Sequence, residues 1–366
     1  MSSRIHCIEA PAKLNIRLKI TGKRPDGYHE LVSIMVPVSL LDFIEIRKKK
    51  APGIDLSISG LPLPLDESNL VTRAAQAFLG STGLQEGLSI KISKNIPVAA
   101  GLGGGSSDAA ATLLLLNEVY SAPLSERDLR GLALQLGADV AFFLLCEPCL
   151  ASGIGEILEP LAKWPELWYV IVSPQLPVST AWVYQNYRMK LTRGEYASIK
   201  KQLKRESLPF SQILENDLES VTSAKFPIIR TIKELLMENG AEGALMSGSG
   251  SSVFGVFFSL EKARFARGRI ALKNVGDVFV TTGYKRQEFR SQESVARRQE
   301  SGDRSQEKGR IRNTKNRTRR QTTKQKQEIW KHNRRVLIGD SGSKIDGFVK
   351  VPFALRYLRA NGRCVS

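Results

Sequence analysis

The stretch that decides the fold is Pro97-Val-Ala-Ala-Gly-Leu-Gly-Gly-Gly-Ser-Ser-Asp108, which lies directly before an alanine- and leucine-rich segment. Its glycines allow the backbone to adopt positive φ and to approach a ligand closely. A helix expected from about Ser106 to Val119 would point its free N–H groups and the positive end of its dipole at this loop. The pattern predicts a phosphate site, and a flexible capped loop without a ligand is the alternative. The residues expected to contact the phosphates of a nucleotide are Pro97, Val98, Ala99, Ala100, Gly101, Leu102, Gly103, Gly104, Gly105, Ser106 and Ser107.

Other phosphate-binding motifs do not fit this loop. A Walker loop requires lysine after its last glycine, but Gly105 is followed by Ser106. A dinucleotide fingerprint requires glycine or alanine three residues after its second glycine, and Ser106 occupies that place relative to Gly103. The motif set of protein kinases is absent. By itself, the loop therefore indicates phosphate binding and no particular enzyme class.

Short β-rich and helical segments surround the loop. Leu88–Ser93 alternates apolar and polar residues, which predicts a half-buried strand. Ser125 and Asp128 have the spacing of a capping box, so a helix is expected over residues 125–136, ending at Gly137. The apolar run Val140–Leu145 is predicted as a buried strand. The remaining predictions are strands at Leu14–Ile20, Phe43–Arg47, Trp168–Val172, Val253–Phe258 and Val278–Thr282, a helix at Pro227–Glu238, and a second glycine- and serine-rich loop at Gly243–Ser252.

The length and the charge distribution divide the chain into three parts. Its 366 residues suffice for about two domains, and we expect them at residues 1–165 and 166–285. Residues 285–366 carry 23 of the 54 Lys and Arg but only 8 of the 36 Asp and Glu, a net charge of +15, whereas residues 1–284 carry +3. The basicity therefore belongs to the C-terminal tail. No segment has the pattern of a secretory signal or a membrane span, and a cytoplasmic location is expected.

The tail, residues 286–366, is predicted to be disordered at least as far as Arg335. This segment is rich in Arg, Lys, Gln, Glu, Ser and Thr and is nearly free of aliphatic and aromatic side chains. It cannot bury enough apolar surface to offset its ordering entropy. Its charge would allow contacts to nucleic-acid phosphates, and a coding sequence with a shifted or missed stop would also explain it. We assign the tail no specific function.

Two of the four cysteines form an isolated C-x-x-C, Cys146 and Cys149. A structural zinc site requires a second pair of ligands, and the three histidines are scattered along the chain. We therefore expect both cysteines to be reduced core residues near a strand end, with a redox pair as the alternative. No residue is predicted to be a metal ligand.

Three motifs together resemble those of the GHMP kinase superfamily, the galacto-, homoserine, mevalonate and phosphomevalonate kinases. They are Ala12-Lys-Leu-Asn-Ile16, the loop Pro97–Asp108, and Leu245-Met-Ser-Gly-Ser-Gly-Ser-Ser252, and they occur in the family's order over residues 8–284. The resemblance implies an α+β fold with two domains: an N-terminal domain like the second domain of ribosomal protein S5, and a ferredoxin-like C-terminal domain. It also implies that the third motif packs against the active site and orders the phosphate loop.

Within the superfamily, the chain resembles the 4-diphosphocytidyl-2-C-methyl-D-erythritol kinases. The resemblance is carried by Gly22-Lys-Arg-Pro-Asp-Gly-Tyr-His-Glu30, Gly137-Ala-Asp-Val-Ala-Phe-Phe143 and Gly153-Ile-Gly-Glu156. It implies transfer of a phosphoryl group from ATP, with Mg²⁺, to the 2-hydroxyl of a CDP-linked methylerythritol, in the non-mevalonate route to isoprenoid precursors. Another GHMP small-molecule kinase, or a nucleic-acid-binding protein acting through the basic tail, are the alternatives. A monomer or a homodimer is expected.

The resemblance also assigns roles to residues. Asp139 would accept the proton of the substrate hydroxyl, and Lys13 would hold that hydroxyl and the migrating phosphoryl group. Without the resemblance, a solvated lysine and an aspartate at a strand start would be the simpler interpretations. The substrate-binding residues that it implies are Asn15 near the reacting hydroxyl, Tyr28 and His29 at the cytosine, and Tyr184 as a second aromatic partner of the base.

Overall fold

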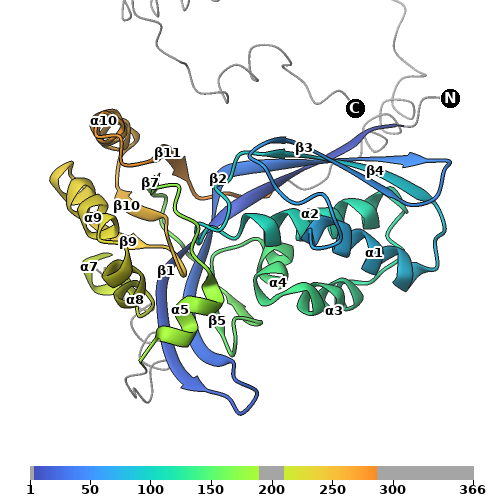
Figure 1. Cartoon of the computed structure of the whole chain (residues 1–366), viewed down its shortest axis with the longest axis horizontal. Helices are drawn as coiled ribbons and strands as arrows, with labels where there is room; N and C mark the ends of the chain where they lie inside the picture. The colour runs from blue at the N-terminus through green and yellow to red at the C-terminus, as the bar shows by residue number, and fades with distance from the viewer. Residues whose placement is uncertain (1–3, 189–209, 287–366) are drawn as a thin grey trace, which may run out of the picture. The chain divides into compact units, whose positions relative to one another are not determined.

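The structure is a computed structural model that describes residues 4–188 and 210–286 (Figure 1). The described residues belong to one compact unit, Met1–Arg286. They contain two β-sheets and several helices, which confirms the α+β class. Apart from Arg286, the tail predicted to be disordered lies outside the described residues. The proposed division at residues 165 and 166 stays a prediction.

A seven-stranded sheet forms the first half of the unit, with the order β3-β4-β2-β1-β8, to which β5 adds on β2 and β6 on β5. Its two longest strands pair antiparallel along most of their length, with register shifts at Pro11/Ala12, Asn15/Arg17 and Ile20/Gly22. Such bulges bend a strand and re-aim its side chains. The strands are β1 (His6–Lys23), β2 (His29–Lys49), β3 (Ile54–Gly60), β4 (Gly87–Lys94), β5 (Cys149–Ser152), β6 (Ile157–Pro160) and β8 (Glu215–Asn216).

Four helices cover one face of this sheet: α1 (Leu70–Thr82), α2 (Gly104–Val119), α3 (Glu126–Leu136) and α4 (Ala138–Leu145) (Figure 1). Their buried faces and the facing strand residues form one apolar core that includes Phe78, Leu113, Phe142 and Phe143. The capping box predicted at Ser125 and Asp128 is present at the start of α3. This layer brings the starts of α2 and α4 to the sheet near the middle of β1.

A four-stranded sheet with the order β11-β7-β10-β9 forms the second half. Alternate residues of β7 (Trp168–Ser173), one of its two inner strands, face opposite sides: Tyr169 and Ile171 pack against the large sheet, and Val170 and Val172 pack against helices. The two sheets therefore share a core. The elements of this half are β7 (Trp168–Ser173), β9 (Gly243–Met246), β10 (Val253–Phe257), β11 (Asp277–Thr282), α5 (Thr180–Asn186), α7 (Phe210–Ile213), α8 (Glu219–Lys225), α9 (Ile228–Glu238) and α10 (Leu260–Ala271).

One element was predicted wrongly. The apolar run Val140–Leu145 lies in helix α4 rather than in a buried strand. Its first four residues are all buried, so the run shows no alternation that would separate a strand from a helix. The predicted strands at Leu14–Ile20, Phe43–Arg47, Leu88–Ser93 and Trp168–Val172 lie within β1, β2, β4 and β7, those at Val253–Phe258 and Val278–Thr282 correspond to β10 and β11, and the helix at Pro227–Glu238 is α9.

Three cysteines lie in the described residues, and none of the three is in a disulfide. Cys146 caps the C-terminus of α4 and Cys149 begins β5, and both are buried. Burial raises the pKa of Cys146 to about 11 and that of Cys149 to about 12, so both thiols stay protonated near neutral pH. The prediction that both are core residues is confirmed, and their reduced state stays a prediction. Among the described helices, none combines the length and the apolar composition that a membrane crossing requires.

Candidate active site

The glycine-rich loop ends in an uncapped helix N-terminus. Gly103 precedes α2 with φ of 70°, in the left-handed region, and α2 begins at Gly104 with no side-chain cap. Because the Ser107 N–H already bonds the Gly103 carbonyl at 2.9 Å, the free donors of the first turn are the N–H groups of Gly104, Gly105 and Ser106. These donors and the positive end of the helix dipole favour an anion.

The second glycine- and serine-rich loop holds the first in place. It is shorter than predicted, since β9 takes Gly243–Met246. The Ser247 hydroxyl donates to the Gly101 carbonyl at 3.0 Å, and the Ser252 N–H donates to the Ala100 carbonyl at 3.0 Å. A Cβ at Gly101 would lie 2.0 Å from the Ser247 carbonyl oxygen, so only glycine fits there. The prediction that this loop packs against the phosphate loop is confirmed.

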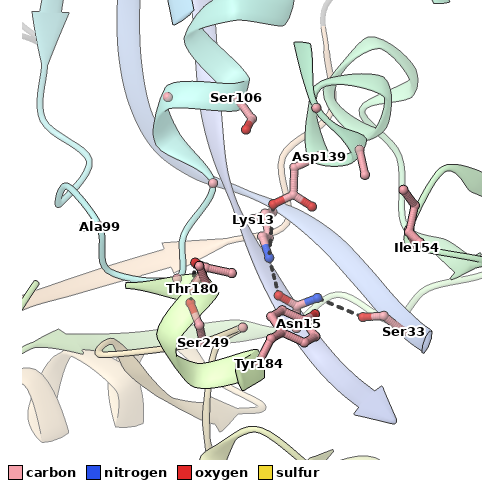
Figure 2. A pocket seen from close by; sticks show the side chains of 18 of the residues that line it. Lys13, Asn15, Ser33, Ala99, Ser106, Asp139, Ile154, Thr180, Tyr184 and Ser249 are labelled. Atoms are coloured by element: carbon pink, nitrogen blue, oxygen red, sulfur yellow. Dashed lines mark hydrogen bonds and ion pairs between the residues drawn. The ribbon is translucent and has the colours of Figure 1, made fainter. Parts of the chain in front are cut away.

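Lys13 and Asp139 meet beside the phosphate loop. The Lys13 Nζ lies 3.7 Å from the Asp139 Oδ2 and donates to the Asn15 Oδ1 (Figure 2). The Lys13 side chain is 6% exposed, whereas that of Asp139 is 41% exposed. Asn15 in turn donates to the Ser33 hydroxyl at 2.8 Å. Asn15 therefore holds the Lys13 ammonium in place, and the partly exposed Asp139 carboxylate remains accessible to a ligand.

The local sequence explains this meeting. Lys13 and Asn15 alternate along β1 with the buried residues Ala12, Leu14 and Ile16, which face the small sheet. Because side chains alternate across a strand, Lys13 and Asn15 point to the helix side. The Lys13 N–H also bonds the Leu102 carbonyl at 2.9 Å, which ties β1 to the loop. Asp139 lies in the first turn of α4, where the helix dipole favours a negative charge.

A buried charge cluster lies under the start of α2. The Lys94 Nζ binds Asp42 and binds Asp108 at 2.7 Å, and all three side chains are at most 1% exposed. Burial lowers the pKa of Lys94, but the two carboxylates raise it by more. Burial raises the pKa of Asp108 to about 7 despite the nearby ammonium. A Cβ at Gly104 would lie 2.8 Å from the Lys94 Nζ, so the ammonium contacts the phosphate loop directly.

Two aromatic residues meet at the other end of the cavity. The His29 and Tyr184 ring centroids lie 5.3 Å apart at 34°, which joins the start of β2 to α5. Burial, and then the positive charge of Lys23, lower the pKa of His29, so its imidazole is neutral at pH 7. Burial, and then the charge of Asp139, raise the pKa of the Tyr184 hydroxyl. Tyr28 is 61% exposed beside them.

A single cavity of about 1040 Å³ connects these groups. This volume is at the upper end of the ~300–1,000 Å³ usual for a small-molecule site. The cavity is lined by the predicted residues Lys13, Asn15, Tyr28, His29, Pro97, Val98, Ala99, Ala100, Gly101, Gly103, Gly104, Gly105, Ser106, Asp139 and Tyr184.

Two predicted nucleotide contacts do not line the cavity. Leu102 is buried in the core between the two sheets. Ser107 is 1% exposed, and its hydroxyl has no hydrogen-bond partner among the described residues. Their side chains therefore support the loop from inside the protein.

Several lining residues had no signal in the sequence. They are Leu63, Leu134 and Thr180, and the Thr180 hydroxyl bonds that of Ser249, a residue of the third motif, at 2.9 Å. Only the packing of distant segments brings them together. Ile154 and Gly155 also line it, and a signal existed for them, since both belong to one of the motifs quoted above.

Comparison with known proteins identifies the family. The model for "GHMP kinases N terminal domain" matches residues 69–147, and the model for "GHMP kinases C terminal" matches residues 196–275. A protein of Citrifermentans bemidjiense named 4-diphosphocytidyl-2-C-methyl-D-erythritol kinase is 48% identical over 262 residues, which is 72% of this chain and 93% of that protein. The chain belongs to the GHMP kinase family.

Further comparisons agree with this assignment. A protein of the same name from Geobacter sulfurreducens is 48% identical over 68% of this GHMP kinase and 89% of the relative. The crystal structure of a 4-(cytidine 5'-diphospho)-2C-methyl-D-erythritol kinase is 37% identical, has a TM-score of 0.64 and is covered completely by 76% of this chain. A homoserine kinase from Cytophaga hutchinsonii, 20% identical with a TM-score of 0.61 over 77% of this chain and 96% of its own, shares the fold.

Membership in the family has direct consequences. The two-domain GHMP kinase fold predicted from the three motifs is confirmed. The chain is an enzyme of the small-molecule phosphotransferase class, with ATP as the phosphate donor that the family implies. The candidate active-site cavity joins the glycine-rich loop, the Lys13–Asp139 pair and the His29–Tyr184 rings.

Proposed function

We propose that this GHMP kinase transfers the γ-phosphoryl group of ATP to the 2-hydroxyl of 4-diphosphocytidyl-2-C-methyl-D-erythritol, a step in non-mevalonate isoprenoid precursor synthesis. The observation that carries the proposal is one cavity with an anion-binding helix start and a Lys–Asp pair at one end and a pair of aromatic rings at the other. The names of the most similar relatives support the same substrate.

In the proposed reaction, Asp139 is the general base. Its carboxylate accepts the proton of the substrate hydroxyl as the oxygen forms a bond to the γ-phosphorus, and the bond from that phosphorus to the β–γ bridging oxygen breaks to release ADP. The Lys13 ammonium, 3.7 Å away, offsets the negative charge that develops on the transferred group. Asn15 orients the ammonium and lies near the reacting hydroxyl. A positioned base contributes ~10²–10⁴-fold to the rate.

The glycine-rich loop holds the nucleotide. The free N–H groups of Gly104, Gly105 and Ser106 point out of the start of α2, and no side chain of the described residues caps them. Phosphate oxygens fit these donors. The contact between the two glycine-rich loops fixes the backbone before the nucleotide binds, so little ordering entropy remains to be lost.

Mg²⁺ is proposed to accompany ATP. The described residues contain no group of three or more His, Cys, Asp or Glu side chains that could hold a metal. Mg²⁺ usually takes one or two protein oxygens together with phosphate oxygens and waters. The donors that the cavity offers beside the loop are the Ser106 hydroxyl and the Asp139 carboxylate. When bound, the ion would neutralise charge on the phosphates.

The cytidine is proposed to bind at the aromatic end. Tyr28 would stack on the base, the neutral His29 imidazole would meet its polar edge, and Tyr184 would close the other side. Stacking of a base on an aromatic side chain is worth ~1–3 kcal/mol. The two free, protonated core cysteines fit the proposed cytoplasmic location. A monomer or a homodimer is proposed.

Alanine substitutions at Tyr28 and His29 test the proposal. In the full-length chain, Tyr28→Ala and His29→Ala should each raise KM for the CDP-linked alcohol about tenfold or more, because ~1.4 kcal/mol of binding corresponds to a factor of ten. KM for ATP should not change. Phe265→Ala is the matched control, since Phe265 is also 61% exposed but lies on α10, outside the cavity. Unchanged KM in both variants would favour a GHMP kinase with a different acceptor.

A further inference from the structure

The C-terminus of α4 is held by a residue from the far end of the described chain. The Arg286 guanidinium donates from Nη2 to the Phe143 carbonyl at 2.8 Å and from Nη1 to the Leu144 carbonyl at 3.1 Å. The Cys146 N–H donates a hydrogen bond to the Phe142 carbonyl at 2.7 Å. Since the last carbonyls of a helix have no partner within the helix, Arg286 supplies donors that α4 itself lacks.

The backbone before Arg286 is attached next to Lys13. Gly283 forms a bridge with Val38, and the Tyr284 N–H donates to the Pro37 carbonyl at 2.9 Å. Pro37 is the cross-strand partner of Lys13 in the β1–β2 pairing. The same segment therefore contacts the strand beside the catalytic lysine and, through the Arg286 side chain, the helix that carries Asp139.

Helix α4 is short and depends on its surroundings. It has eight residues, Ala138–Leu145, and isolated helices of this length are not stable in water. The Phe143 ring packs under the phosphate loop, because a Cβ at Gly103 would lie 2.9 Å from it and 3.0 Å from the Lys13 Cγ. A shift of α4 along its axis would move Asp139 relative to both Lys13 and the loop.

A guanidinium suits this place. The C-terminal end of a helix dipole favours a positive charge, and the planar fork of arginine can reach two carbonyl oxygens at once. Lysine, a point charge on a flexible stem, would hold the helix less rigidly. Both carbonyls belong to residues that lie about one helical turn after Asp139.

We propose that Arg286 is a positioning residue for phosphoryl transfer, which holds α4 so that Asp139 stays beside Lys13 at the reacting hydroxyl. The inference rests on the proposed function, because it needs Asp139 as the base. A misplacement of a reacting group by about 1 Å can cost ~10²-fold in rate. The loss of Arg286 should therefore act on kcat and leave the binding of both substrates in place.

Steady-state kinetics of full-length variants with ATP and 4-diphosphocytidyl-2-C-methyl-D-erythritol test this. We expect Arg286→Ala to lower kcat about 10- to 100-fold, with KM for each substrate within about threefold of the wild-type value. The kcat of Arg286→Lys should lie between that of Arg286→Ala and that of wild type. Guanidinium chloride at millimolar concentration should restore part of the kcat of Arg286→Ala. Arg267→Ala is the matched control, since the Arg267 Nε also donates to a backbone carbonyl, that of Val278, at 3.4 Å in the small-sheet half.

Several outcomes would overturn the inference. They are a kcat of Arg286→Ala within twofold of wild type, an effect on KM alone, or a loss that neither Arg286→Lys nor guanidinium reduces. If Arg286→Ala does not fold, Arg286→Lys is measured in its place. A lower kcat with unchanged KM supports the inference, and an unchanged kcat overturns it. Should the wild-type chain not phosphorylate the CDP-linked alcohol, the proposed function fails. If wild type is active and Arg286→Ala equals it, only the inference fails.

Discussion

The 3.7 Å between the Lys13 Nζ and the Asp139 Oδ2 is longer than a hydrogen bond. A hydroxyl oxygen placed between them can lie within ~2.6–3.2 Å of each, the distance that proton transfer requires. The pair is asymmetric, since the ammonium is buried and bonded to Asn15, whereas the carboxylate faces the cavity. This arrangement is consistent with the proposed roles, charge stabilisation for Lys13 and proton acceptance for Asp139.

Removing the carboxylate charge should abolish most of the rate. We expect Asp139→Asn to lower kcat by ~10²-fold or more, because the amide keeps the shape but cannot accept the proton. KM should change little. Asp55→Asn, at a 69% exposed carboxylate that pairs with Lys49 on the large sheet, should keep wild-type kinetics. A near-wild-type kcat for Asp139→Asn would remove Asp139 from the role of base.

The pH dependence of substrate binding should report on His29. Its pKa lies below the ordinary value of 6.5 because of burial and the charge of Lys23. Affinity for the CDP-linked alcohol should therefore be constant from pH 7.5 down to about 6.5. Below that pH the affinity should fall, because the bound substrate would bury a charged imidazole. The unfolded chain binds this proton more readily, so the shift also lowers the stability of the folded state as pH falls in that window.

Two variants separate this effect from other titrations. His29→Gln should bind more weakly but show no fall in affinity between pH 6.5 and 5. Lys23→Met removes a positive charge and should move the fall to higher pH, because Lys23 faces His29 across the β1–β2 pairing. Isothermal titration calorimetry of each full-length variant provides the measurement. An unchanged pH profile in His29→Gln would contradict the assignment.

At the scale of elements, the start of α2 rests on the buried charges of Lys94, Asp42 and Asp108. Asp42 also accepts the backbone N–H groups of Asn95 at 2.5 Å and Ile96 at 2.9 Å, just before the phosphate loop. This cluster therefore joins β2, β4 and α2 beneath the loop. Asp108 belongs to the glycine-rich stretch Pro97–Asp108, and its ion-pair partner Lys94 also binds Asp42, 66 residues earlier in the sequence than Asp108.

Loss of the Lys94 ammonium should destabilise the fold strongly. Lys94→Met leaves two buried carboxylates without a cation, and breaking a buried pair costs ~3–5 kcal/mol. Lys91→Met is the matched control in the same strand, since Lys91 is 42% exposed and lies 3.4 Å from Glu45, and such a pair contributes ~0–1 kcal/mol. Urea unfolding of both full-length variants measures the difference. Equal stabilities would show that the cluster is not a structural support.

The sequence predicted these elements unevenly. Alternating strands such as Leu88–Ser93 and capped helices such as residues 125–136 carry local signals, and both were predicted correctly. Helix α4 was not, because a short apolar run is compatible with either a buried strand or a buried helix. In the structure, α4 follows Gly137 directly and the Phe143 carbonyl near its C-terminus accepts from Arg286, and neither feature is visible in the run itself.

At the scale of the whole molecule, the site depends on two sheets that share a core. Tyr169 and Phe254 of the small sheet pack with Leu14 and Ile16 of β1, which fixes the strand that carries Lys13. The motifs predicted the fold, and most of the residues that line the cavity belong to them. Residues such as Thr180 and Leu134 could not be predicted, since their place depends on packing between segments far apart in the sequence.

Competition among acceptors is the sharpest test of the proposed substrate. The full-length chain is incubated with ATP, Mg²⁺ and an equimolar mixture of 4-diphosphocytidyl-2-C-methyl-D-erythritol, mevalonate and homoserine, and the phosphorylated products are separated and quantified. We expect the phosphate on the 2-hydroxyl of the CDP-linked alcohol, with at most traces on the other two acceptors. Phosphorylated mevalonate or homoserine without the CDP-linked product would contradict it.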